Sequence, residues 1–166
     1  MTQQFDFTDT PLEGLKIVQR RTVDDSRGFL SRVYCAKEFA GHGFNKSVSQ
    51  INQTLTYQKG TVRGLHYQLM PHTEIKLVSC VKGEIFDVAV DLRKGSPTFL
   101  YWHSEVLSEK NQRSMLIPRH KHSILQYPLE CEKVGPLHEK ALMIFCIPEM
   151  KGVILIDLDF QKFHYR

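Results

Sequence analysis

The stretch that decides the fold runs from Gly60 to Asp91 and reads GTVRGLHYQLMPHTEIKLVSCVKGEIFDVAVD. The first part of this stretch, which contains Arg63 and His66, has the two-residue alternation of a strand rather than the period of a helix. Because these two residues are three positions apart, a regular strand places them on opposite faces unless Gly64 introduces a bulge. Gly64 is therefore a candidate hinge in the strand.

Two further strands follow in the same stretch. Lys76–Ser79 and Glu84–Asp91 read as strands, and the turn signal Lys82-Gly83 lies between them. After a turn from Met70 to Thr73, we expect the three consecutive strands to form a β-meander.

The rest of the chain repeats this pattern of short strands separated by turn residues. Residues 1–13 read as an arm or a first edge strand, Thr22–Gly28 reads as a turn, and Ala36–Gly41 reads as a short helical turn ended by glycine. Many short strands with turns between them predict an all-β sandwich or barrel. The expected strands are Leu15–Arg20, Phe29–Tyr34, Val48–Leu55, Phe99–Leu107 with Trp102 as its large anchor, Ser114–Pro118, Leu137–Ile147 and Val153–Asp157.

Length and composition favour one domain spanning residues 1–166, because 166 residues with 42% hydrophobic content can bury one good core. The longest apolar segment, near Ala141–Ile147, is far shorter than the roughly 20 residues that cross a bilayer. The first residues lack the pattern of a secretory signal, so we expect a cytoplasmic protein with no membrane contact. The cysteines are widely spaced and are expected to be reduced: Cys35, Cys80, Cys131 and Cys146.

The formal net charge of +4 is spread among acidic residues rather than gathered in a basic run. Nucleic-acid binding usually needs a concentrated basic patch, so we expect no nucleic-acid partner. A local anionic ligand such as a diphosphate fits the charge better.

Five segments in a fixed order carry a family resemblance. Together they resemble the dTDP-4-dehydrorhamnose 3,5-epimerase family, over about Gly14 to Pro118. The resemblance implies a cupin-like double-sheet jelly roll with few short helices, a homodimer paired through N-terminal strands, and an isomerase that needs no metal or other cofactor. The segments are Asp25–Phe29, Gln50–Thr54, Thr61–Gln68, Lys76–Val78 and Asp87–Arg93.

The reaction that the resemblance implies is epimerisation at C3, C5 or both of a nucleotide-linked 4-keto-6-deoxy sugar, as in rhamnose biosynthesis. The ketone acidifies the protons at C3 and C5, so a base on one face and a proton donor on the other are enough. His66 is the candidate base, since an ordinary imidazole titrates near neutral pH. Lys76, with His122, would stabilise the enolate oxygen that develops at C4.

The same resemblance implies a set of binding residues for the nucleotide-sugar substrate. Arg27 and Arg63 would hold the diphosphate, because a guanidinium forks onto phosphate oxygens. The amides of Gln50 and Asn52, two residues apart on one strand face, would bind sugar or phosphate oxygens.

The sequence departs from the family pattern at Arg32 and again in its last third. Arg32 stands where the family has a glutamate that contacts the nucleotide, and His122 is one residue short of the family's histidine spacing. Lys140 occupies the position of the catalytic tyrosine, and the carboxylate that pairs with the catalytic histidine has no counterpart. We therefore expect a slow or partial epimerase, in which Lys140, a displaced tyrosine or water returns the proton.

Ordinary interpretations of these residues stay open. A histidine in a strand is often structural, Arg27 can be a solvated turn residue, Lys76 can be a surface lysine, and Gln50 and Asn52 can be the solvent face of an edge strand. Two other functions also stay open. The first, motivated by the altered last third, is a sugar-nucleotide-binding relative without turnover.

The second alternative is a metal-dependent cupin oxygenase. His120 and His122 share a strand face in this interpretation, and His66 or Glu74 would add further ligands.

Overall fold

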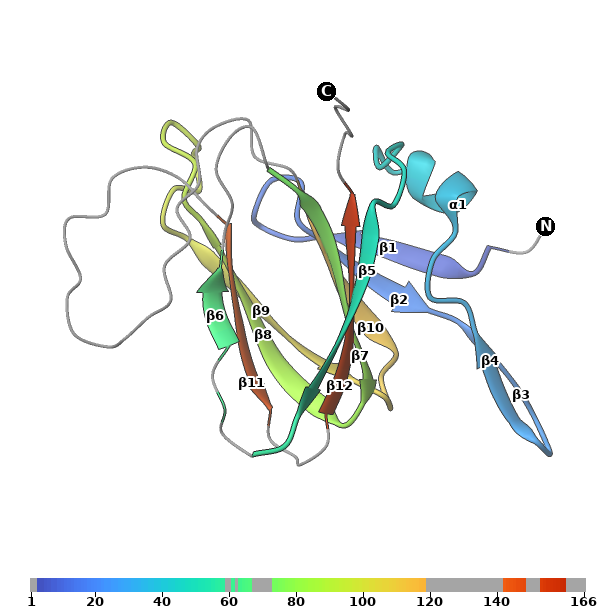
Figure 1. The fold of residues 1–166 in the computed structure, drawn as a ribbon. Coiled ribbons are helices and arrows are strands. Elements are labelled where there is room, and N and C mark those ends of the chain that lie inside the picture. Colours follow the sequence, from blue (N-terminus) through green and yellow to red (C-terminus); the bar gives the residue numbers. More distant parts are fainter. Residues whose placement is uncertain are drawn as a thin grey trace, which may run out of the picture.

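Two β-sheets packed face to face form the body of the protein (Figure 1). A computed structural model of the chain describes residues 3–58, 61, 63–66, 73–118, 142–148 and 153–160. Within them the secondary structure is almost entirely strands, all paired antiparallel, so the predicted all-β, double-sheet architecture is confirmed.

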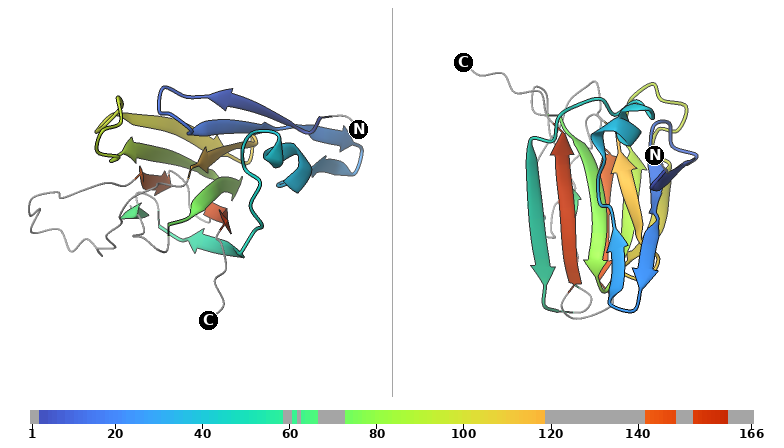
Figure 2. Two further views of the ribbon diagram at one scale, coloured as in Figure 1. Left: turned by 90° about the horizontal axis from the view of Figure 1, so that it is seen from above. Right: turned by 90° about the vertical axis from the view of Figure 1, so that its right-hand side faces the viewer.

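The larger sheet has six strands, which Figure 2 shows side by side. Neighbours in this sheet come from distant parts of the sequence: β10 pairs with both β2 and β7, and β12 pairs with both β7 and β5. The order is β1 (Phe5–Asp9), β2 (Lys16–Arg20), β10 (Arg113–Ile117), β7 (Ile75–Lys82), β12 (Val153–Phe160) and β5 (Gln50–Thr56).

The smaller sheet has four strands and faces the larger one. Its order is β6 (Arg63–His66), β11 (Leu142–Pro148), β8 (Glu84–Asp91) and β9 (Trp102–Ser108). A separate hairpin of β3 (Thr22–Asp25) and β4 (Gly28–Ser31) projects from the body (Figure 1).

Apolar side chains from both sheets meet in the space between them. Inward-facing apolar residues of β2, β7, β8, β9 and β10 form this core, because alternate residues of a strand share one face and a buried face favours apolar side chains. The buried cluster contains Leu12, Leu15, Ile17, Val78, Cys80, Ile85, Ala89, Leu107, Met115 and Ile117.

A second buried cluster covers the opposite face of the larger sheet. Helix α1 (Ala36–Ala40) and the segment after it place Phe39 and Phe44 on this face, where the Phe39 ring packs edge-on against Phe5 with centroids 5.2 Å apart. The predicted short helix is thus confirmed, and among the described residues no helix is long and apolar enough to cross a membrane.

The predicted β-meander is wrong. Strands β6, β7 and β8 follow one another in the sequence, but β7 belongs to the larger sheet and β6 and β8 belong to the smaller one. Lys82 and Gly83 therefore turn the chain from one sheet to the other, and Gly83 has a φ of 80°, which favours glycine.

Two smaller expectations also need correction. The segment Thr22–Asp25 is strand β3, and only the tip of the expected turn, around Arg27, is a turn. Trp102 is no core anchor: it begins β9 with 62% of its surface exposed, on the face opposite to buried Leu107.

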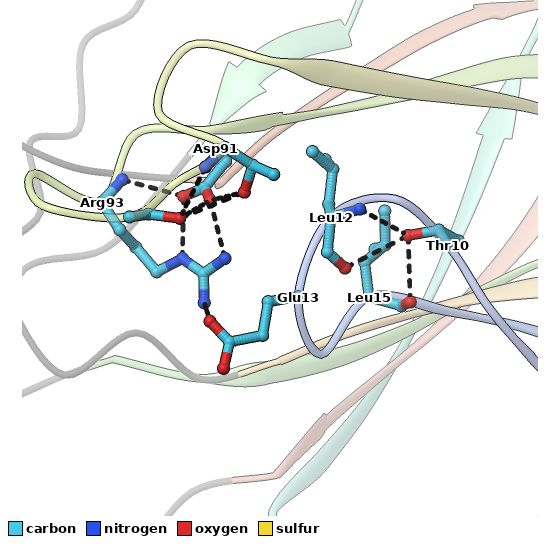
Figure 3. A network of polar contacts seen from close by, with 8 residues as sticks. Thr10, Leu12, Glu13, Leu15, Asp91 and Arg93 are labelled. Carbon is cyan, nitrogen blue, oxygen red and sulfur yellow. Dashed lines mark hydrogen bonds and ion pairs between the residues drawn. The ribbon is translucent and has the colours of Figure 1, made fainter.

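Asp91 holds the loop between β8 and β9 in place (Figure 3). Its fully buried carboxylate accepts hydrogen bonds from the Arg93 Nη2 (2.6 Å) and Nε (2.8 Å), the Ser96 hydroxyl (2.7 Å) and the Thr98 hydroxyl (2.6 Å). Burial alone would raise the pKa of Asp91, but the hydrogen bonds outweigh burial and hold this pKa far below its usual range.

Asp91→Asn should lower the free energy of unfolding by about 1 to 3 kcal/mol, because charged hydrogen bonds are lost around a buried group. The ionised form contributes stability above its ordinary pKa and loses it as the pH falls through the lowered pKa of the folded state. Urea denaturation should thus give a constant difference between parent and variant from pH 7 to about pH 5, and a smaller one below about pH 4. Asp25→Asn, in an exposed ion pair, is the control and should have little effect. A difference that persists undiminished at pH 3 would contradict this account.

Candidate functional site

Strand β6, with the sequence Arg63-Gly64-Leu65-His66, is an edge of the smaller sheet and pairs with β11. His66 lies opposite Ile144, and Arg63 lies opposite Cys146. Three steps along β6 thus match two steps along β11, a register shift that leaves one extra residue in β6, as a β-bulge does. The register shift lies in the stretch that contains Gly64, the candidate hinge of the strand.

The bulge brings the backbone positions of Arg63 and His66 to the same side of the sheet, since their partners Cys146 and Ile144 are two residues apart. On its other edge β11 pairs with β8: Cys146 lies opposite Asp87, and Ile144 lies opposite Ala89. Both of these residues have no exposed surface. The side shared by the Arg63 and His66 positions is therefore the one that faces the other sheet.

Arg63 also connects the two sheets at this edge. Its Nε donates a hydrogen bond to the Thr56 hydroxyl, 3.0 Å away. Thr56 ends β5 in the larger sheet with 2% of its surface exposed, whereas Arg63 begins β6 in the smaller sheet and is largely exposed. Strands β5 and β6 are thus held across from each other.

The face of β5 toward the smaller sheet is polar along its whole length. Asn52 pairs with Asp157, which pairs in turn with Val78 of the interior cluster, so Asn52 shares the inward alternation. Gln50, Thr54 and Thr56 are an even number of residues from Asn52 along β5, so they lie on the same face of the strand. The prediction that Gln50 and Asn52 share one strand face is confirmed, and that face is the inner one.

Lys76 shares the inward alternation of β7 with Val78 and Cys80. Its ammonium lies 2.9 Å from the Glu74 carboxylate, and the two side chains are 21% and 7% exposed. An ammonium can be partly buried when a carboxylate partner accompanies it. Lys76 is thus an inward-facing charged residue rather than a surface lysine.

Arg27 is not brought to the other candidate residues within the chain. It lies at the tip of the β3–β4 hairpin, its side chain is 87% exposed, and its Nη2 is 2.5 Å from the Asp25 carboxylate. The hydrogen bonds between these partners raise the pKa of Arg27 and lower the pKa of Asp25. His122 and Lys140 lie outside the described residues.

Arg32, at the position where the resemblance implies a glutamate, lies beside α1. It forms an ion pair with Glu38, with Arg32 Nη1 3.8 Å from Glu38 Oε1. Both residues line a cavity of about 810 Å³ between β1 and α1, together with Phe7 and His42, whose rings stack 3.8 Å apart.

Sequence reasoning missed the contact of Thr56 with Arg63, the pairing of Glu74 with Lys76 and the burial of Asp87. The alternation through Gln50 and Asn52 continues to Thr56 and was a usable signal for it. Glu74 has the two-residue spacing from Lys76 that places both on one face of an extended segment. Asp87 had no signal, because its burial depends on β11 and β9 lying on either side of β8.

The oxygenase reading required a cluster of metal ligands. In the parts of the chain that the structure describes, no group of three or more His, Cys, Asp or Glu residues is arranged to hold a metal ion. His120 and His122 lie outside those parts.

A two-sheet sandwich of antiparallel strands, with an inner face that turns polar at one edge, is the architecture of a cupin-like jelly roll. The sequence model of the dTDP-4-dehydrorhamnose 3,5-epimerase family matches residues 9–125. The chain belongs to this family.

Individual relatives agree with this assignment. The chain is 41% identical to the dTDP-4-dehydrorhamnose 3,5-epimerase of Sinorhizobium fredii and 43% identical to that of Shigella flexneri, over 68% and 66% of its own length. These matches span only 57% and 60% of the two relatives.

A solved structure extends the likeness beyond the matched sequence. The dTDP-6-deoxy-D-glucose-3,5-epimerase of Legionella pneumophila, in complex with dTDP-4-keto-L-rhamnose, superposes with a TM-score of 0.77 at 31% identity. The superposition covers 96% of this chain and 73% of that chain.

Proposed function

We propose that the chain is an isomerase that epimerises C3, C5 or both of a nucleotide-linked 4-keto-6-deoxy sugar of the dTDP-4-dehydro-6-deoxyglucose type, in deoxysugar biosynthesis. The observation that carries the proposal is the register shift in β6. It brings the Arg63 and His66 positions to the inner side of the smaller sheet, across from the amide-bearing face of β5. Membership of the epimerase family supports the same reaction.

His66 is the proposed base. It takes a proton from the carbon next to the ketone, and the electron pair moves into the C4 oxygen to form an enolate. Lys76, inward-facing and paired with Glu74, supplies positive charge for that oxygen. Proton transfer beside a ketone needs only side chains, so we propose that no metal or redox cofactor takes part.

The nucleotide part of the substrate would bind along the polar edge. Arg63 holds the diphosphate, and the Gln50 and Asn52 amides contact sugar or phosphate oxygens, since all three are on elements that face one another. His122 would add a donor near the C4 oxygen. The Legionella relative, which is bound to a dTDP-linked 4-keto sugar, supports this substrate class.

We propose further that the protein acts as a homodimer of single jelly-roll domains, each comprising residues 1–166. An isolated two-stranded hairpin is marginally stable in water, yet β3–β4 projects from the body and exposes Val23, Phe29 and Leu30 by 62%, 59% and 74%. A second copy would cover these side chains. Arg27 at the hairpin tip would then contact the ligand of the other subunit.

The cytoplasm is the proposed location. Cys35 and Cys80 are free thiols, which suits a reducing compartment.

His66→Ala should abolish hydrogen exchange at C3 and C5, because the base is removed. Binding of dTDP should stay within about tenfold of the parent, since the lost interaction belongs to the transition state. Proton NMR of dTDP-4-keto-6-deoxyglucose in deuterated buffer follows the exchange, and calorimetry follows the binding. Near-normal exchange in the variant would rule out His66 as the base.

Arg63→Ala should weaken dTDP binding by about tenfold or more, because a charge-assisted contact to the diphosphate is lost. Arg27→Ala should also weaken binding. The control is Lys110→Ala, which removes a positive charge from the exposed turn between β9 and β10 and should leave affinity unchanged.

Mixing the Arg27→Ala and His66→Ala proteins tests which subunit Arg27 serves. Mixed dimers should regain activity, because one of their two sites combines an intact His66 with the other subunit's Arg27. Absence of any recovery, with mixed dimers demonstrated by mass spectrometry, would place Arg27 outside the partner's site.

The chain should act as a slow or partial epimerase. Lys140 at the family's tyrosine position differs from a phenol in charge and reach, so the enolate regains its proton mainly on the face that lost it. Deuterium should enter C3 or C5 faster than the rhamnose-configured sugar accumulates. Full conversion at about 10 per second, an ordinary enzyme rate, would show that another donor replaces the tyrosine.

A further inference from the structure

The hydrogen bond between Thr56 and Arg63 joins the last residue of β5 to the first residue of β6. Thr56 has 2% of its surface exposed, and β-branching restricts its χ1 rotation, so the position of its hydroxyl is fixed by the strand. Arg63 is largely exposed and has a long, flexible side chain. The rigid partner therefore determines the conformation of the mobile one.

The hydrogen bond to Thr56 determines which edge of the Arg63 guanidinium remains available to bind an oxyanion. Arginine carries five N–H donors in one plane, and an oxyanion binds either across the two terminal nitrogens or across Nε and one of them. Because Nε of Arg63 donates to Thr56, its two terminal nitrogens are the pair left for a bidentate contact.

We infer that Thr56 is a positioning residue, which acts through Arg63 to orient the diphosphate of the ligand. The inference rests on the proposed function. Arg63 begins the strand that carries His66, with the bulge between them. A guanidinium fixed at this point aligns the anionic end of the ligand relative to the base, and a side chain already ordered in the free protein loses less conformational entropy on binding.

A purely structural role is the competing explanation. The same bond closes the connection from residue 57 to residue 62, which crosses from one sheet to the other. In that case its loss would lower the melting temperature of the protein. Ligand affinity would then fall whether or not Arg63 is present.

A double-mutant cycle separates the two explanations. Thr56→Val keeps the shape and removes the hydroxyl, and it should weaken dTDP binding by about 3- to 10-fold, the effect of one hydrogen bond. In an Arg63→Ala background the same change should have no effect on affinity. Thr56→Ser, which restores the hydroxyl, should recover most of the parent affinity.

The matched control is Thr54→Val, on the same strand and the same inward alternation. It should change dTDP affinity by an equal factor with and without Arg63. Calorimetry measures each affinity, and differential scanning calorimetry confirms that the variants melt within about two degrees of their own parents.

Three results would overturn the inference. The first is an unchanged affinity in Thr56→Val, and the second is an equal loss in the Arg63→Ala background. In both cases the proposed function is unaffected, provided that the parent protein binds dTDP. The third is a parent protein that fails to bind dTDP, which removes the proposed function and this inference together.

Discussion

Burial of β7 on both faces is the constraint on which the rest of the structure depends. Val78 and Cys80 lie in the cluster between the sheets, whereas Ile75 and Leu77 lie in the cluster beneath α1. A strand covered on both sides must be apolar at nearly every position, and it must have hydrogen-bonded neighbours along both edges. Strands β10 and β12 supply those neighbours, so the large sheet is built outward from β7.

Lys76 is the exception within that strand, and its surroundings explain how it is tolerated. It lies on the inner face at the Gln50 end of β5, since Lys76 pairs with Asp159 and Asp159 pairs with Gln50, and Glu74 accompanies it. A charge without such a partner in the interior would cost several kcal/mol. The interior of the sandwich therefore has an apolar part that stabilises the fold and a polar part where Lys76 and the inner face of β5 lie.

The sequence predicted the local features of this arrangement and missed the long-range ones. Alternation located most strands, and the three-residue spacing of Arg63 and His66 pointed to a bulge at Gly64, because these signals depend on neighbouring residues alone. The meander was wrong because alternation cannot distinguish a hairpin from a corner that leads to the other sheet, as at Gly83. The exposure of Trp102 was missed for a related reason: both faces of β9 carry apolar residues, and only the packed sheets decide which face is buried.

The strands that pair with β5 and with β6 are synthesised late, and this affects the order in which parts of the protein fold on the ribosome. Among the described strands, β6 pairs with β11 and β5 pairs with β12, and both partners lie near the end of the sequence. The chain synthesised first can assemble β1, β2, β7, β8, β9 and β10, but the strands that carry Gln50, Arg63 and His66 wait for residues beyond 142. Such distant pairings are slow to form and leave strand edges open in the meantime. The edges formed by β5 and β6 are thus completed only after β11 and β12 have been synthesised, later than the strands around β7.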